Sequence, residues 1–338
     1  MILNLKLMIC RPRSFLTLIF LVPNLYSDTL SVMTFNVQNL FDTNNDPYKD
    51  DKAFLPLQEK LSEKHQKECK KIYVKSWRDE CLYLDWNEET KNAKLKNVFK
   101  NIISFEGSGP DLIAFQEVEN INILKQLFTL LKPYGYIDYK LLESKDKRGI
   151  DTAYISKYRI FNPKLHYIRF SSKFQTKDTR PIFEATLKIH KSTIKIYNAH
   201  FPSNYYDLQM RIESFEALRD LHKKHHYPSI VLGDFNISSK DDIKYKVYEN
   251  QSKEWLVAQI EGCNTCKGTY YFNSGNSWDF LDSIFISKNR GISFDVSSIK
   301  VHTTKSNTYK NSGKPYRFDP KLKKGVSDHF AMVAKINI

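Results

Sequence analysis

Several apolar stretches of the sequence end in polar side chains of the types that hydrolytic enzymes use. They are Asn36, Glu117, His200, Asp234 with Asn236, Asp282, and Asp328 with His329. Singly, each has an ordinary explanation, because Asp and Asn are common in turns and an isolated His is more often structural than catalytic. Together, carboxylates from separate segments predict an oxygen-rich pocket for a hard cation such as Mg²⁺ or Mn²⁺. The histidines beside them predict acid–base chemistry.

The stretch "SIVLGDFN" contains the most specific pair of these residues. Asp234 and Asn236 are two positions apart and directly follow a β-branched run, so both side chains can point to one side of the strand end. Enzymes with α/β folds bind their ligands at the carboxyl ends of strands. We expect the strand to end at Gly233, where the absence of a side chain permits a tight turn.

These residues require strands that meet at a common edge, and the hydropathy pattern predicts such strands. Short apolar or alternating runs indicate strands, whereas apolar residues at helical spacing indicate helices. Strands are expected at residues 29–38, 112–115, 152–157, 165–170, 182–189, 193–200, 229–232, 278–287 and 328–338, and helices at 93–103, 121–131 and 208–221. This alternation predicts a layered α/β fold of two packed sheets with helices outside, and with the polar residues at one edge.

The motifs that carry these residues resemble a known family. In order along the chain they read "TFNVQNLFD", "DLIAFQEVEN", "KDKRGIDTAY", "NAHFPSN", "VLGDFN", "FLDSIFIS" and "GVSDHF". They are similar, in the same order, to the motifs of the endonuclease/exonuclease/phosphatase superfamily, and most similar to its bacterial secreted-nuclease branch. The resemblance implies a four-layer α/β/β/α sandwich with two packed mixed β-sheets, and hydrolysis of a phosphoester that depends on a divalent metal.

The resemblance also implies a metal site. Glu117 matches the metal-binding glutamate of the family, Asn36 lies beside it, and Asp328 would bind or orient the metal from the last strand. The ion would be Mg²⁺, with Mn²⁺ or Ca²⁺ as alternatives. Some relatives carry an acid two positions after Asn36, where this chain has Gln38, so a second metal ligand is not expected there.

The same comparison implies roles in catalysis. Asp234 would position or deprotonate the attacking water, and Asn236 would hold that water or a phosphate oxygen. Asp282 would bond His329 and fix its tautomer, so that His329 acts as an acid or base or as a cationic phosphate clamp. His200 matches a second histidine of deoxyribonuclease-like members, which contacts the phosphate or assists the leaving group.

Further residues are candidates for binding the substrate or supporting the site. Arg180, in "TRPIFEATL", matches an arginine near the site that can hold phosphate in a bidentate manner, and a surface salt bridge is the alternative. Asp151 is expected to support a strand end. Lys323 and Lys324 belong to a basic run that leads into Asp328 and His329, and are expected to bind substrate.

Composition indicates an exported basic protein. The 338 residues carry a formal net charge of +14, which favours a polyanionic partner, although solubility alone is another reason for a basic surface. Residues 1–27 read as an export signal, because basic residues precede the apolar run 15–22, which is too short to cross a bilayer. A buried first strand is the alternative. We therefore expect a bacterial periplasmic or secreted monomer without a stable membrane anchor.

The remaining sequence, residues 28–338, is expected to form one catalytic domain with a charged insertion at about residues 42–90. Cys69 with Cys81 and Cys263 with Cys266 suit two local disulfides in an oxidising compartment. A zinc site is the competing interpretation, but there is one Cys-x-x-Cys and no second pair to match it.

The catalytic motifs alone do not define the substrate, because this superfamily also includes phosphatases of inositol phosphates and sphingomyelinases. The basic clusters favour nucleic acid, with DNA ahead of RNA, because each neutralised phosphate releases counterions. The aromatic run 269–278 would add stacking surfaces. The leading prediction is an exported endonuclease, and the alternative is a phosphodiesterase or phosphatase acting on a phospholipid or inositol phosphate. A non-catalytic binding protein is disfavoured because the acidic set is complete.

Overall fold

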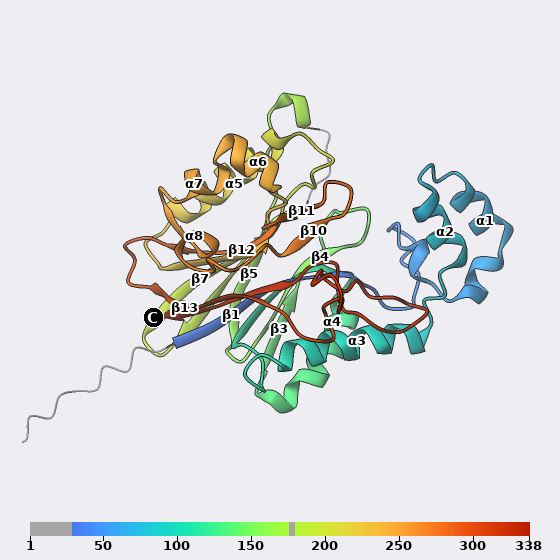
Figure 1. Cartoon of the computed structure of the whole chain (residues 1–338), viewed down its shortest axis with the longest axis horizontal. Coiled ribbons are helices and arrows are strands. Elements are labelled where there is room, and N and C mark those ends of the chain that lie inside the picture. Colours follow the sequence, from blue (N-terminus) through green and yellow to red (C-terminus); the bar gives the residue numbers. More distant parts are fainter. Residues whose placement is uncertain (1–28, 176–179) are drawn as a thin grey trace, which may run out of the picture.

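The computed structural model describes residues 29–175 and 180–338. Two six-stranded mixed sheets form its centre (Figure 1). The predicted export signal, residues 1–27, lies outside the described residues. Among the residues that are described, no helix is both long enough and apolar enough to span a bilayer.

The first sheet has the strand order β13-β14-β1-β2-β4-β3. Its strands are β1 (Thr29–Leu40), β2 (Leu112–Val118), β3 (Asp138–Leu141), β4 (Asp151–Ser156), β13 (Ser293–His302) and β14 (Ala331–Asn337). β1 and β2 run parallel, and the other neighbouring strands are antiparallel. The carboxyl ends of β1 and β2 therefore meet at one edge, where Asn36 is paired in register with Gln116.

The second sheet has the order β5-β6-β7-β8-β12-β9. Its strands are β5 (Ile160–His166), β6 (Ile182–Ile189), β7 (Ser192–His200), β8 (Ser229–Asp234), β9 (Trp255–Val257) and β12 (Asp282–Ser287). Here β7 and β8 are the parallel pair. A separate hairpin of β10 (Tyr270–Phe272) and β11 (Ser277–Asp279) is bridged from Tyr270 to His329, in the segment that leads to β14.

The main core lies between the two sheets, and each sheet packs a second core against helices. In β8, Ile230 and Leu232 belong to the core between the sheets, whereas Val231 belongs to the core beneath the helices. Side chains alternate between the two faces of a strand, so a strand buried on both faces must be apolar at consecutive positions. This explains the unbroken apolar run before Asp234.

The helices cover the outer faces of the sheets (Figure 1). α3 (Glu88–Ile103) and α4 (Ile121–Leu131) pack on the first sheet. α5 (Leu208–Lys223) and the short α7 (Val247–Gln251) pack on the second. α6 (Ser239–Tyr245), α8 (Ala258–Glu261) and 3₁₀ turns at Lys132–Tyr134 and Ser172–Phe174 complete the connections. The predicted α/β/β/α sandwich is confirmed.

The charged segment after β1 forms a small helical lobe that projects from the sandwich (Figure 1). It consists of 3₁₀ turns at Lys52–Phe54 and Leu57–Leu61, then α1 (Glu63–Lys70) and α2 (Lys75–Tyr83). The helical periodicity of the sequence is weak here. The buried apolar residues of the two helices form one small cluster of Cys69, Cys81 and Leu82. We call this segment, residues 52–86, the insertion lobe.

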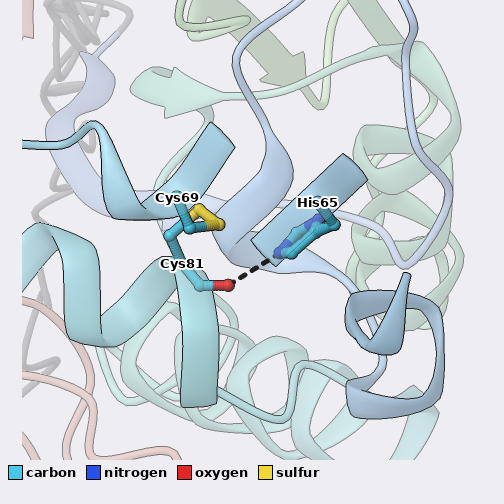
Figure 2. A group of neighbouring side chains, drawn as sticks. All are labelled: His65, Cys69 and Cys81. Carbon is cyan, nitrogen blue, oxygen red and sulfur yellow. Dashed lines mark hydrogen bonds between the residues drawn. A yellow bond between two sulfur atoms is a disulfide. The ribbon is translucent and has the colours of Figure 1, made fainter. Parts of the chain in front are cut away.

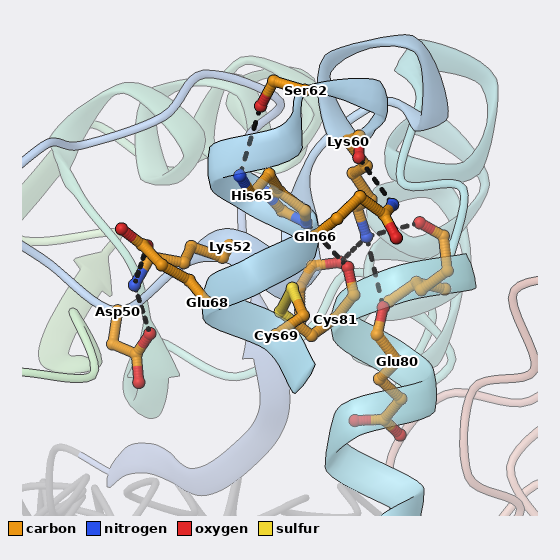
Figure 3. The surroundings of a disulfide bond; sticks show 12 residues. Asp50, Lys52, Lys60, Ser62, His65, Gln66, Glu68, Cys69, Glu80 and Cys81 are labelled. Carbon is orange, nitrogen blue, oxygen red and sulfur yellow. Dashed lines mark hydrogen bonds and ion pairs between the residues drawn. A yellow bond between two sulfur atoms is a disulfide. The ribbon is translucent and has the colours of Figure 1, made fainter. Parts of the chain in front are cut away.

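The insertion lobe is stabilised by a disulfide and buried polar groups rather than by a large core. Cys69 and Cys81 form a disulfide that joins α1 to α2, and His65 Nε2 donates a hydrogen bond of 2.9 Å to the Cys81 carbonyl (Figure 2). The Lys60 ammonium, fully buried, donates to the carbonyls of Ala53, Glu80 and Leu84 (Figure 3). A cation at the carboxyl end of α2 also interacts favourably with the helix dipole.

The second expected disulfide, between Cys263 and Cys266, is also present. His65, Cys69 and Cys81 have the close spacing of metal ligands, but the two sulfurs are bonded to each other and leave no thiolate to coordinate an ion. The disulfide prediction is confirmed, and the zinc interpretation of these cysteines is wrong.

Some predicted elements differ from the structure. The strand expected at residues 165–170 lies earlier, at Ile160–His166. The strand expected at 278–287 is divided into β11 and β12, and β13 was not among the predicted strands. β5 lies at the edge of its sheet and contains Pro163, which cannot donate a ladder hydrogen bond.

Candidate active site

Three polar residues of the second sheet lie side by side because of strand register. Asp234 at the end of β8 is paired with His200 at the end of the parallel strand β7. On its other side it is paired with Asp282, the first residue of β12. β12 is antiparallel to β8, so its beginning lies next to the end of β8. Residues more than 80 positions apart in sequence thus form one row.

The first sheet contributes to the same edge. Asn36 Nδ2 donates a hydrogen bond of 3.0 Å to Asp234 Oδ2 across the gap between the sheets. Ser327 Oγ donates to the Asn36 carbonyl at 2.7 Å, which fixes the segment containing Asp328 and His329 against β1. The structure therefore brings the predicted residues of both sheets together.

The turn after β8 differs from its predicted form. The strand continues through Asp234, and the residue in the left-handed conformation is Asn236, at φ 53°. Gly233 is needed for another reason: a Cβ there would lie 2.5 Å from the Ala199 carbonyl oxygen of β7. The turn is held by the Asn236 backbone N–H, which donates to Asp234 Oδ1 at 3.0 Å, and by Asn236 Nδ2, which donates to the Phe201 carbonyl at 3.1 Å.

His329 and Asp282 form a buried ion pair. His329 Nδ1 lies 2.7 Å from Asp282 Oδ2, with 7% of His329 exposed and none of Asp282. Burial opposes the charge on the imidazole, but the carboxylates of Asp282, Asp234 and Asp328 outweigh it and raise the pKa of His329 to about 10. The ring is therefore an imidazolium at neutral pH, and its bond to Asp282 is made by Nδ1 and not by Nε2.

Asp234 has the properties of a general base. Burial, together with the nearby charge of Asp282, raises the pKa of Asp234 to about 7, against the opposing effects of His329 and Asn36. Both of its oxygens are oriented by hydrogen bonds, Oδ1 from the Asn236 N–H and Oδ2 from Asn36. A base is most effective when its pKa lies near the working pH.

The second histidine, His200, is held in the neutral state. Burial, and then the positive charge of Arg180, lowers its pKa well below the ordinary value. Arg180 Nη1 lies 3.1 to 3.2 Å from the two ring nitrogens and can only donate, so it bonds an unprotonated nitrogen. His200 Nε2 lies 3.6 Å from Asp234 Oδ2. Because Arg180 is buried, the alternative of a surface salt bridge is wrong.

Glu117 lies at an irregularity of β2. The register of β2 against β4 shifts between Gln116 and Val118, and Glu117 has φ 65°, a strained conformation that redirects its side chain. Its Oε2 accepts from the Asn39 N–H at 3.0 Å, and its Oε1 lies 3.9 Å from His200 Nε2. Burial opposes ionisation of Glu117, but the positive charges of Arg148, His329 and Arg180 together lower its pKa.

The donor set fits a hard divalent cation. The pKa of Glu117 is lowered, which favours its carboxylate form, Asn36 has an amide oxygen, and Asp328 supplies a second carboxylate, so every candidate ligand is an oxygen. Asp234, Asp282 and His329 also have ligand atoms within 4.8 Å of one another, but His329 Nδ1 is already hydrogen-bonded to Asp282 Oδ2 at 2.7 Å. Glu117, Asn36 and Asp328 are therefore the better metal ligands.

The structure also identifies site residues that were not predicted. Arg148, in the "KDKRGIDTAY" motif, donates from Nη2 to Asn39 Oδ1 at 3.3 Å and is the largest positive influence on Glu117. Lys94 of α3 is buried beside the site, where burial lowers its pKa to about 7 despite the charges of Asp328 and Glu117. Arg148 could have been predicted, because it belongs to a motif that resembles the family. Lys94 could not, because a lysine on a helix gives no sequence signal.

The remaining predicted residues support the site or lie near it. Gln38 Oε1 accepts from the Asp328 N–H at 3.2 Å, so it positions that segment. Asp151 is buried and accepts from the Ser144 N–H, in line with a supporting role, and burial raises its pKa to about 7. Lys323 is paired with Glu89 of α3, and Lys324 is exposed.

The aromatic run at residues 269–278 forms the β10–β11 hairpin next to the site. The Tyr270 ring lies 4.9 Å from the His329 ring, centroid to centroid, and the two residues form an isolated bridge. The Thr269 hydroxyl accepts from the Asp282 N–H at 3.1 Å. The hairpin therefore buttresses the ion pair of Asp282 and His329.

The class of protein follows from this fold and site: two packed sheets with an acidic, histidine-containing edge are the architecture of a phosphoester hydrolase. The model described as endonuclease/exonuclease/phosphatase family matches residues 82–337. The chain belongs to that family. All of β1 and most of the insertion lobe precede the matched region.

Solved structures support the fold. A mannosyl-6-phosphatase from Bacteroides thetaiotaomicron aligns at 15% identity and TM-score 0.57, over 91% of this chain and all (100%) of that one. A family protein from Leptotrichia buccalis aligns at 19% identity and TM-score 0.52, over 91% and 100%. Truncated TDP2 from Caenorhabditis elegans aligns at 14% identity and TM-score 0.50, over 92% and 98%. A search of curated proteins found no significant match.

Proposed function

We propose that the protein is an exported nuclease that hydrolyses phosphodiester bonds of nucleic acid, DNA in particular, with the help of Mg²⁺. The observation that carries the proposal is the pairing, at one strand edge, of a carboxylate suited to accept a proton with a buried imidazolium. Asp234 is the first and His329 the second. Mn²⁺ and Ca²⁺ are the alternative ions.

Glu117, Asn36 and Asp328 would hold the metal. When bound, a divalent cation neutralises the charge that develops on the phosphate and on the leaving oxygen. The fixed backbone of β1 and β2 positions these ligands, because Asn39 and Gln38 bond Glu117 and the Asp328 segment respectively.

The residues of the chain account for the proton transfer and for binding of the phosphate. Asp234 accepts a proton from water as the water oxygen bonds phosphorus and the bond from phosphorus to the leaving oxygen breaks. His329 Nε2 donates to a phosphate oxygen or to the leaving oxygen, and Asp282 maintains its charge. Arg180 and neutral His200 add donors beside Asp234.

Nucleic acid is favoured as the substrate by charge. The net charge is +14, and the basic run that includes Arg317 and Lys321 leads directly into Asp328 and His329. Export is supported by the basic and apolar character of residues 1–27 and by the disulfides, which suit an oxidising compartment. Fractionation of expressing cells, with sequencing of the amino terminus, tests this part of the proposal.

The test of activity is nicking of supercoiled plasmid by the purified protein with Mg²⁺, Mn²⁺ or EDTA. His329→Gln should abolish nicking. His226→Gln should not, because His226 is exposed and precedes the first residue of β8, at the end of the strand away from Asp234. If folded wild-type protein binds the metal but leaves the plasmid intact, the nuclease proposal is refuted. Hydrolysis of mannose 6-phosphate, inositol phosphates or sphingomyelin in the same preparation would then identify the substrate class.

A further inference from the structure

A cleft of about 780 Å³ lies between the insertion lobe and the loop that joins β13 to β14. One wall is α2 of the lobe, and the other is formed by Tyr309 and residues 317–321 of the loop. Trp86, Phe318 and Lys94 also line it. In Figure 1 the loop before β14 extends towards the lobe, in agreement with this arrangement. We call this space the insertion cleft.

The insertion cleft adjoins the candidate active site through two shared residues. Gln38 and Asn39 line it, and the same residues bond the candidate metal ligands. The Asn39 N–H donates to Glu117 Oε2 at 3.0 Å, and Gln38 Oε1 accepts from the Asp328 N–H at 3.2 Å. A phosphoester held at Glu117 would therefore place one of its two substituents at the mouth of the cleft.

The two walls of the cleft present exposed aromatic rings. Tyr83, at the end of α2, is 68% exposed, and Tyr309, in the loop, is 44% exposed. Tyr309 lies on Tyr316, with 4.2 Å between the ring centroids, so its ring is supported from behind. Exposed rings with one face supported are the usual platforms for unpaired bases, because every base has a face that stacks.

The walls also carry a cation that can exchange its partner. Arg317 Nη2 lies 3.7 Å from Glu80 of α2, and both side chains are about half exposed, at 54% and 42%. Exposed ion pairs at such a distance contribute little to stability. Arg317 can therefore leave Glu80 for a phosphate, to which it donates two parallel hydrogen bonds.

The lining argues against other occupants. Charged side chains come from every wall of the cleft, including Lys75, Asp79, Lys94, Asp319 and Lys321, and an acyl chain would remove them from water without pairing them. A lone sugar phosphate would fill only part of the space, since clefts of about 300 to 1,000 Å³ bury larger ligands. A nucleotide has both the planar ring and the anionic group that the walls match.

We propose that the insertion cleft binds the nucleotide adjoining the scissile phosphate of a single-stranded nucleic acid, with Tyr83 and Tyr309 against its base and Arg317 on its far phosphate. The inference rests on the proposed nuclease function and extends it by naming a subsite. Part of the lobe wall, including Lys75, Asp79 and Glu80, precedes the region that matches the family model, whereas Tyr83, Tyr309 and Arg317 lie within that region.

Steady-state cleavage of a short single-stranded oligonucleotide tests the stacking part. Tyr83→Ala and Tyr309→Ala should each raise KM by about tenfold, the loss expected for one base on an aromatic ring, with kcat little changed. Tyr73→Ala is the matched control, because Tyr73 is 95% exposed in the same lobe and does not line the cleft. An oligonucleotide without a base at the adjoining position should bind wild type as weakly as the variants do.

A second pair of variants tests the phosphate contact. Arg317→Gln and Glu80→Gln break the same ion pair, but only the loss of Arg317 should raise KM. Equal effects of the two would show that the pair merely holds the walls together, and the phosphate contact would be refuted.

Binding in EDTA, followed by fluorescence anisotropy of a labelled oligonucleotide, separates this proposal from the proposed function. If wild type binds the oligonucleotide in a way that depends on Tyr83 and Tyr309 but does not cleave it, the nuclease function is refuted and the subsite is retained. Binding and KM that are the same in these variants as in Tyr73→Ala would overturn the subsite. Variants that weaken binding of mannose 6-phosphate, but not of the oligonucleotide, would also overturn it and assign a sugar phosphate to the cleft.

Discussion

Asp282→Asn is the substitution that tests the charge state of His329 most directly. The side chains are nearly the same size, and the amide oxygen can still accept from His329 Nδ1, which lies 2.7 Å away. Among the described residues, Asp282 Oδ1 has no hydrogen-bond partner. Replacing this oxygen with an amide nitrogen therefore breaks no hydrogen bond. The substitution therefore removes a charge and leaves the packing in place.

The magnitude follows from the surroundings of His329. Its pKa of about 10, against the ordinary 6.5, corresponds to roughly 5 kcal/mol in favour of the imidazolium. Asp282 is the largest favourable contribution, and burial acts against the charge. Without Asp282 we expect a pKa below 6.5, so that fewer than about a tenth of the molecules are charged at pH 7.5. The rate of cleavage should fall at least about tenfold at that pH.

The assay is the pH profile of kcat/KM for wild type, Asp282→Asn, His329→Gln and the double variant, with the nitrogen shifts of His329 followed by NMR. Activity of Asp282→Asn should recover as the pH falls towards 5.5, whereas His329→Gln should not recover. The two losses should be far from additive, because both remove the same cation. A titration of His329 that is unchanged in Asp282→Asn would refute this reasoning.

Three further predictions concern the metal, the base and the insertion lobe. Glu117→Gln should weaken binding of Mg²⁺ at least about tenfold by isothermal titration calorimetry, since metal sites select charged oxygen ligands, with the melting temperature in EDTA little changed. The rate should rise with pH through about 7 as Asp234 loses its proton, and fall as His329 loses its own through about 10, with both limbs moved lower by a bound divalent charge. Reduction of the disulfide between Cys69 and Cys81 should lower the melting temperature and raise KM for an oligonucleotide, while the Kd for Mg²⁺ stays the same, because the disulfide orders α2 and not the metal ligands.

The edge of polar residues was predictable because it depends on local pattern. Parallel strands β1 with β2 and β7 with β8 end at one edge, so apolar runs that stop at Asn36, Glu117, His200 and Asp234 had to bring these residues near one another. Asp282 begins a strand instead of ending one, and only the antiparallel pairing of β12 with β8 places it in the row. The motif resemblance was needed for that position.

Other features were not predictable because their causes are distant in sequence. The reason for Gly233 is its closeness to the Ala199 carbonyl of a neighbouring strand, not the turn that follows. The helices of the insertion lobe depend on Lys60 and on a disulfide rather than on an amphipathic pattern, so weak periodicity concealed them. Local propensity also misplaced β5, where an edge position tolerates Pro163 and a left-handed Asn162.

The opposite charge states of the two histidines show how one edge of the sandwich can bind phosphate and also activate water. His329 faces Asp282 and is cationic, whereas His200 faces Arg180 and is neutral. If both rings were charged, Asp234 between them would lose its proton well below pH 7 and be a weak base. If neither were charged, less positive charge, mainly that of Arg180 and Arg148, would remain to offset a phosphate there. Arg180→Met should therefore raise the pKa of His200 as well as weaken phosphate binding, and an NMR titration in which His200 stays neutral in this variant would refute that coupling.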